Sequence, residues 1–161
     1  MFSIGEHVIH PGQGVCQVTG FREKPTPMLV LEAKQGHART TMLYPVAQSD
    51  RLHPCVTREE AERLIHDYPT MACDPFTERN SALEETHFKA ELKQGAPATV
   101  RVAKTMRDRI SQARAQDKKP SSYYARVLKE ADRRVAEELS IALGTSEDEV
   151  QARFAAMFDA N

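Results

Sequence analysis

The first 56 residues alternate between apolar and polar positions in short runs, and turn residues such as Pro11, Gly12 and Gly14 separate the runs. Alternation over four to eight residues is typical of half-buried β-strands. The predicted strands are 15–21, 28–33 and 40–44, with further short runs around Phe2 to Ile9. Several short strands at this spacing predict a small barrel or a strongly bent sheet.

After residue 56 the apolar positions recur every three or four residues, which is the period of an amphipathic helix. Thr57 and Glu60 predict a capping box at the start of the first helix. The predicted helices are 57–68, about 77–93, about 98–115, one between a cap at Ser121 or Ser122 and Gly144, and one from Thr145 or Ser146. We predict a β module at 1–56 with the short helix 57–68, a connector at 69–76 that forms the domain boundary, and an all-helical domain at 77–161.

A sheet of this size is expected to leave one strand edge exposed, and fifty-odd residues are marginal for an independent core. Such an edge can pair with a strand of another protein, or it can be blunted and unused. The sequence leaves both interpretations open.

Positive charge is concentrated between residues 101 and 134. This stretch holds eleven Lys and Arg against four Asp and Glu, a local charge of about +7 in a chain whose net charge is -1. Segregated positive charge is typical of a protein with a polyanionic partner. Solvated helix faces would give the same pattern, and the charge alone does not separate the two.

No residue set for catalysis, metal binding or a cofactor is visible. The three cysteines form no CxxC pair, the six histidines are scattered, and Gly12-Gln13-Gly14 is too short for a phosphate loop. The adjacent Glu84 and Glu85 are interpreted as a solvated helix face. We therefore expect a protein that is not an enzyme. Free thiols, no signal-peptide pattern and no apolar run of membrane-spanning length predict a cytoplasmic protein without a membrane partner.

Three stretches resemble the CarD-like (CarD/CdnL) family of bacterial RNA polymerase-binding transcription regulators. The opening 2–15, FSIGEHVIHPGQGV, resembles the start of that family, and 88–92, FKAEL, looks like its aromatic-Lys-x-x-Leu segment. The stretch from Pro120 through Leu139 is similar to the family's longest helix. The order and spacing of the three stretches extend the resemblance over nearly the whole chain.

The resemblance implies an α+β fold, with a small Tudor/SH3-like β barrel module followed by an all-helical C-terminal domain. It also implies docking of the β module on the RNA polymerase β subunit. The helical domain would contact promoter DNA non-specifically, through the backbone and minor groove, and alter the lifetime of the open promoter complex. The polymerase-binding residues expected on this basis are Arg22, Lys24, Arg39, Met42, Leu43, Tyr44 and Pro45. The expected DNA-binding residues are Lys89, Lys93, Arg101, Lys104, Arg126 and Lys129.

Three positions depart from the family pattern. Glu84 stands where many members carry a Trp that wedges into the minor groove, and a carboxylate cannot unstack bases as an apolar ring does. Leu43 stands where an Arg is frequent, and Ala125 stands where some relatives place a Lys on DNA. Lys89 and Arg126 match basic positions. The alternative hypothesis is therefore a polymerase-docking adaptor that has lost the DNA wedge contact.

Overall fold

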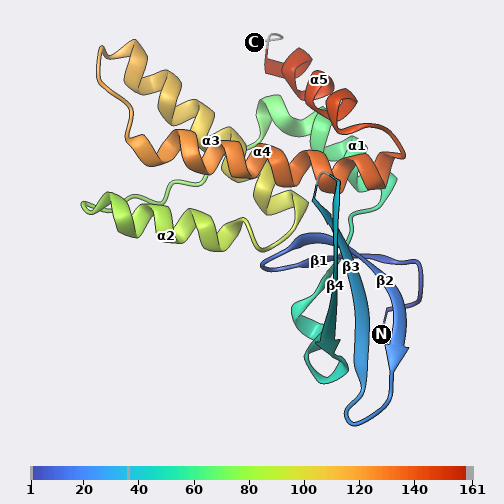
Figure 1. Ribbon diagram of the computed structural model, residues 1–161. Helices are drawn as coiled ribbons and strands as arrows, with labels where there is room; N and C mark the ends of the chain where they lie inside the picture. The colour runs from blue at the N-terminus through green and yellow to red at the C-terminus, as the bar shows by residue number, and fades with distance from the viewer. Residues whose placement is uncertain (1, 36, 159–161) are drawn as a thin grey trace. The chain divides into compact units, whose positions relative to one another are not determined.

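The computed structural model describes residues 2–35 and 37–158 (Figure 1). The chain divides into two compact units, Met1–Cys55 and Val56–Asn161. The first unit is an antiparallel sheet and the second is helical, so the predicted α+β class is confirmed.

The sheet of the first unit has five strands in the order β4-β3-β2-β1-β5. The strands are β1 (His7–His10), β2 (Gly14–Arg22), β3 (Met28–Gln35), β4 (Ala38–Pro45) and β5 (His53–Pro54), with a 3-10 helix η1 (Val46–Arg51) before β5. The three predicted strands are confirmed. The ladder between β2 and β3 is irregular between Val18 and Gly20, and the long strands β2, β3 and β4 are visibly bent and twisted (Figure 1).

The alternation of buried and exposed side chains along β2 and β3 forms the core of the first unit. Cys16 and Val18 on β2 share one face of the sheet with Leu29, Leu31 and Ala33 on β3, and all five are buried. Burial of one such aliphatic side chain stabilises a fold by about 1.5–3 kcal/mol. The intervening side chains of these strands lie on the opposite face of the sheet.

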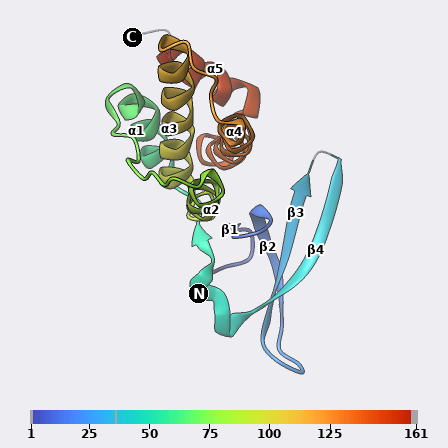
Figure 2. The ribbon, with the colours of Figure 1, turned by 90° about the vertical axis from the view of Figure 1, so that its left-hand side faces the viewer.

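The second unit contains the five predicted helices. They are α1 (Arg58–Asp67), α2 (Ser81–Glu91), α3 (Ala96–Ala115), α4 (Ser122–Leu143) and α5 (Glu147–Phe158), with a 3-10 turn η2 (Tyr68–Thr70) after α1. The capping box of Thr57 and Glu60 is present, and Gly144 ends α4 in the left-handed conformation with φ +64°. The two long helices α3 and α4 cross obliquely (Figures 1 and 2).

Helix α2 begins four residues later than predicted. Asn80 accepts a hydrogen bond from the Ala82 N–H at 2.9 Å and so caps the helix at Ser81 instead of at Thr77.

The division between the units also lies earlier than the predicted connector 69–76. Helix α1 belongs to the second unit, because Ala61, Ile65 and Tyr68 are buried in one cluster with apolar residues of α3, α4 and α5. The segment 69–76 therefore lies inside the helical unit, after α1.

Candidate functional site

Strand β4 is the long open edge of the sheet. The Val46 N–H donates to the Pro27 carbonyl at 3.1 Å, so these two residues form a hydrogen-bonded pair next to the β3–β4 ladder. In the same register, Val30 lies opposite Leu43 three pairs further along. Hydrogen-bonded and non-bonded pairs alternate along an antiparallel ladder. The backbone N–H and C=O groups of Thr41 and Leu43 therefore point away from β3, and no strand pairs with them within the described residues.

The side chains of β4 divide between two faces. Met42 and Tyr44 pack against the buried core of the sheet. Leu43 lies on the other face with 46% of its surface exposed, directly opposite Val30. The open edge thus combines free backbone groups with an exposed apolar side chain.

The usual devices that blunt an edge strand are weak in β4. It is eight residues long, Arg39 is its only charged residue, and its only proline is the last residue, Pro45. Arg39 makes an exposed ion pair with Glu32 at 3.7 Å, which leaves the Thr41–Leu43 part of the edge without charge. The other edge strand, β5, has only two residues.

The predicted polymerase-binding residues are spread along this sheet. Arg22, opposite Met28, and Pro45, also opposite Met28, lie at one end of the three-strand ladder, and Lys24 lies in the turn after β2. Arg39 lies near the other end of β4. Of Met42, Leu43 and Tyr44, only Leu43 directs its side chain away from the core. Met42 and Tyr44 pack against the core and hold the edge strand in place.

His10, the last residue of β1, contacts Tyr44. The two rings meet edge to face at 5.4 Å, and the His10 Nδ1 accepts hydrogen bonds from the Gly12 and Gln13 N–H groups at 3.0 and 3.1 Å. Burial lowers the pKa of His10, which favours the neutral ring that these bonds need.

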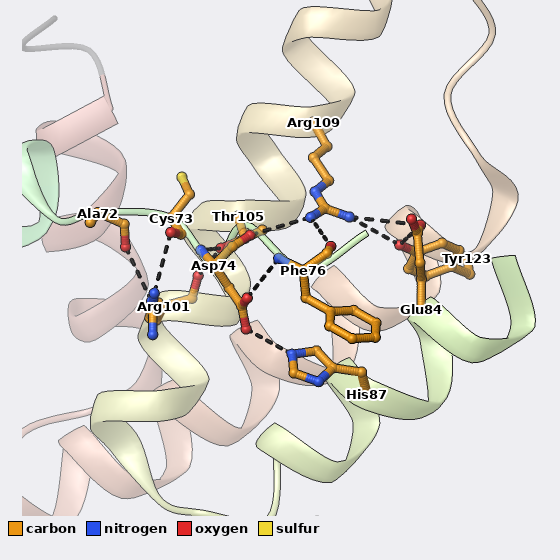
Figure 3. Close-up of polar contacts among 10 residues, drawn as sticks. All are labelled: Ala72, Cys73, Asp74, Phe76, Glu84, His87, Arg101, Thr105, Arg109 and Tyr123. Carbon is orange, nitrogen blue, oxygen red and sulfur yellow. Dashed lines mark hydrogen bonds and ion pairs between the residues drawn. The ribbon is translucent and has the colours of Figure 1, made fainter. Parts of the chain in front are cut away.

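In the helical unit, Glu84 is buried and is not part of a solvated face, so that prediction is wrong. Its carboxylate accepts a hydrogen bond from the Tyr123 hydroxyl at 2.7 Å (Figure 3). It also accepts one from the Glu78 N–H at 2.9 Å. The Arg109 guanidinium lies 3.7 Å from it. The residue at the family's wedge position therefore faces the interior, whereas its neighbour Leu83 is 53% exposed.

A signal for the burial of Glu84 is present in the sequence. Residues four apart share a helix face, and Glu84 precedes the fully buried Phe88 by four positions. The apolar Leu83 falls outside that face. Glu84 was placed on a solvated face because of its charge, although its position on the helix indicates burial.

Arg109 also binds the segment between α1 and α2. Its guanidinium donates to the carbonyls of Asp74 at 3.2 Å and Phe76 at 2.5 Å (Figure 3). Asp74 accepts from His87 at 2.8 Å, and the His87 ring stacks on Phe76 with ring centres 4.0 Å apart. Burial raises the pKa of Asp74, but the His87 and Phe76 hydrogen bonds outweigh it and hold the pKa below its usual value.

Two predicted DNA-binding residues on α3 hold the same segment. Arg101 donates to the carbonyls of Ala72 and Cys73, both at 3.3 Å (Figure 3). The Lys104 ammonium donates to the carbonyls of Tyr68 at 2.7 Å and Pro69 at 2.9 Å. Both cations therefore have a structural role in fixing the chain after α1 against α3.

Four of the other eight cations of the basic stretch are also paired. Arg107 binds Asp132, Arg126 binds Glu85 at 3.0 Å, and Arg133 and Arg134 both bind Glu130. Among the remaining predicted DNA-binding residues, Lys89 pairs with Glu85 at 2.9 Å, while Lys93 and Lys129 are exposed. The predicted set therefore includes structural cations and surface cations, and it does not form one cluster.

Glu138, on α4, is a buried carboxylate that binds the first residue of the helical unit. It is 3% exposed, and its Oε2 accepts a hydrogen bond from the N–H of Val56, the first residue of the unit, at 3.0 Å. The Ala96 N–H, at the start of α3, also donates to this carboxylate. Burial raises the pKa of Glu138 to about 7, against the opposing effect of these two hydrogen bonds.

Comparison with known families gives a match that covers the sheet. Residues 2–56 match the CarD-like/TRCF RID domain. The match spans the sheet of the first unit, and on this basis we refer to that unit as the RID domain. The resemblance to CarD-like proteins is thereby confirmed for residues 2–56, and the RID domain is an RNA polymerase-interacting, transcription-related module. The helical unit lies outside the match, and no curated protein matches the chain.

The structure adds two negative observations beside the RID domain. No helix in the described part of the chain is long and apolar enough to cross a membrane. No group of three or more His, Cys, Asp or Glu side chains suited to a metal ion occurs among residues 2–35 and 37–158.

Proposed function

We propose that this protein is a transcription regulator that docks on the β subunit of RNA polymerase through the β4 edge of its RID domain. The helical unit then contacts promoter DNA non-specifically and changes the lifetime of the open promoter complex. The observation that carries the proposal is an RID domain whose edge strand presents unpaired backbone groups beside exposed Leu43.

The geometry favours docking by strand addition. In that mode main-chain hydrogen bonds supply the affinity, and alternate side chains supply specificity. The outward N–H of Thr41 and Leu43 would bond a polymerase strand, and Leu43 with Val30 would offer it an apolar contact. This contact is less ionic than one made by the Arg that is frequent in the family at position 43.

The test is binding of the full chain to the immobilised β subunit. Thr41→Pro removes an outward N–H that β3 does not use, so the sheet should remain folded while docking is lost. Thr41→Val removes the hydroxyl but keeps the N–H, and it should bind as the wild type does. Equal binding by both variants would rule out strand addition at β4.

The DNA contact is proposed for the exposed cations of the helical unit. Lys and Arg contacts to phosphate give affinity without reading sequence, and they make the binding constant fall steeply with salt. We expect DNA affinity to decrease linearly with salt on logarithmic axes. Binding that is absent or insensitive to salt would remove the DNA part of the proposal.

A second candidate is an adaptor that docks on polymerase without contacting DNA. It is favoured by the internal pairing of most cations between residues 101 and 134 and by the burial of Glu84 at the wedge position. The two candidates differ in promoter-complex lifetime. A regulator should change that lifetime through its helical unit, whereas an adaptor with the RID domain intact should leave it unchanged.

We also propose that the protein is not an enzyme. A cavity of about 330 Å³ between α3, α4 and α5 is lined mainly by apolar side chains, and its charged groups Arg107 and Asp132 are paired with each other. Such a site lacks the convergent polar groups of a catalytic pocket.

A further inference from the structure

Four of the eleven cations between residues 101 and 134 differ from the rest. Within the described residues, the charged groups of these four make no hydrogen bond or ion pair, and all four side chains are exposed. They are Arg114, Lys118, Lys119 and Lys129. The other seven bind backbone carbonyls or carboxylates of their own unit, as described above. The charge that is available to a partner is therefore much smaller than the sequence suggests, and it is localised.

Three of these cations gather where α3 meets α4. Arg114 is in the last turn of α3, and Lys118 and Lys119 lie in the short connection before α4; we call these three residues the α3–α4 corner. The connection lies at one extremity of the helical unit (Figure 1). The Lys118 N–H bonds to the Ala113 carbonyl at 2.8 Å, which fixes the chain against the end of the helix. The corner is therefore an ordered, projecting surface.

Few negative charges oppose the corner. Asp117 is the only acidic residue between Arg109 and Lys129, and the first turn of α4 has none. A cation in the last turn of a helix stabilises the helix dipole, which accounts for Arg114. That effect decays within the last turn and does not account for Lys118 and Lys119, which lie beyond Ala115.

The fourth cation extends the charged surface along α4. Arg114 lines one surface hollow with Ile110 and Leu128, and Lys129 lines another with the same two residues. Arg114 and Lys129 thus flank a shared apolar ridge. Asp108 also lines the first hollow, and Glu130, Asp132 and Glu147 line the second, where Glu130 and Asp132 are already paired with arginines. A row of solvated cations fits the regularly spaced phosphates of a nucleic acid backbone better than it fits a compact acidic ligand.

We propose that the α3–α4 corner is the main phosphate-contacting surface of the helical unit. This inference rests on the proposed DNA contact and assigns that contact to residues outside the set expected from the family resemblance. The contact sets affinity and position on DNA and reads no base sequence.

The experiment measures binding of the full chain to labelled double-stranded DNA of random sequence by fluorescence anisotropy, at about 50–200 mM salt. The test variant is Arg114→Gln/Lys118→Gln/Lys119→Gln. The control is Arg22→Gln/Lys24→Gln/Lys34→Gln, which removes one exposed Arg and two exposed Lys from the RID domain and changes the net charge equally. If three phosphate contacts are lost, the logarithmic salt slope should decrease by about 2 to 3, and affinity at about 0.1 M salt should fall on the order of 10²-fold. The control should bind within about twofold of wild type, because screening limits long-range charge effects.

The outcomes separate this inference from the function on which it rests. Steep, salt-dependent binding by the wild type that the corner variant retains would overturn the assignment and leave the DNA contact standing. Equal weakening of DNA binding by the control variant would mean that net charge alone causes the effect, and it would also overturn the assignment. Absence of wild-type binding would overturn the DNA contact itself. Circular dichroism checks folding, and Lys118→Gln/Lys119→Gln, which changes no helical residue, should give about two thirds of the slope change.

Discussion

The β4 strand of the RID domain leaves the N–H and C=O groups of Thr41 and Leu43 unpaired among the described residues, whereas the helical unit uses most of its cations on its own backbone and carboxylates. The RID domain offers a partner uncharged backbone groups, and the residue types of β4 do not indicate them. The helical unit carries a conspicuous basic stretch that is largely internal. A charged residue is therefore a candidate contact for a partner only after its contacts within the fold are known.

The largest expected effect tests the internal role of the cations. Arg109→Met should lower the free energy of unfolding by about 3–5 kcal/mol, because it leaves the buried Glu84 carboxylate without its cation and two carbonyls without their donor. Chemical denaturation measures the change.

Arg114→Met on the same helix is the matched control. Its side chain is exposed and contributes only to the helix dipole, so its effect should stay within about 1 kcal/mol. Similar losses in both variants would contradict the division into internal and available cations.

The next largest effect concerns Glu138, the buried carboxylate of α4 that binds the Val56 N–H. Between pH about 4.5 and about 7, folded Glu138 holds a proton that the unfolded chain has released, so its contribution to stability falls as pH rises through that window. Glu138→Gln keeps an acceptor for the Val56 N–H but cannot ionise. The variant should therefore gain about 2–3 kcal/mol relative to wild type between pH 5 and pH 8.

Denaturation of both proteins across that pH range provides the measurement. The difference between variant and wild type cancels the other carboxyl groups, several of which have lowered pKa values and the opposite trend. A difference that does not change with pH would mean that Glu138 ionises in the folded state at its ordinary pKa.

The sequence was sufficient for most of the fold because the decisive patterns are local. Period-two alternation located β2, β3 and β4, and period-3.6 patterns with the Thr57 and Gly144 signals located the helices. The boundary between the units was misplaced because it depends on where α1 packs. Its apolar residues Ala61 and Ile65 would fit either neighbour.

The candidate sites were predictable only in part. Which backbone groups of β4 face outward depends on the register with β3, and a shift of one residue would exchange them. The partners of Arg101 and Lys104 are carbonyls about thirty residues away in the chain, and no local pattern indicates such contacts. The family resemblance pointed to basic positions but could not show which of them the fold already uses.

A smaller effect separates two lysines within the helical unit. Lys104→Met should lower the free energy of unfolding by about 1–2 kcal/mol through loss of two charge-assisted hydrogen bonds, with no change in the salt slope of DNA binding. Lys129→Met should leave stability within about 0.5 kcal/mol and reduce that slope by about 0.9. A reduced salt slope with unchanged stability in Lys104→Met would instead indicate that Lys104 contacts DNA.

The smallest effect concerns the sheet, where His10 orders the turn beside Tyr44. Burial holds the pKa of folded His10 below its unfolded value of about 6.5, so its stabilising contribution is complete above that pH and is lost as the pH falls towards the folded pKa. Protonation of Nδ1 removes the acceptor for the Gly12 and Gln13 N–H groups, a loss of at most about 1 kcal/mol. His10→Asn offers a non-titrating acceptor for a turn N–H and should make stability less sensitive to acid than in the wild type.

Docking on the polymerase β subunit should follow the same pH dependence, because the His10 ring supports the Tyr44 side of β4. Docking that is unchanged at mildly acidic pH would show that the open edge depends on its backbone alone.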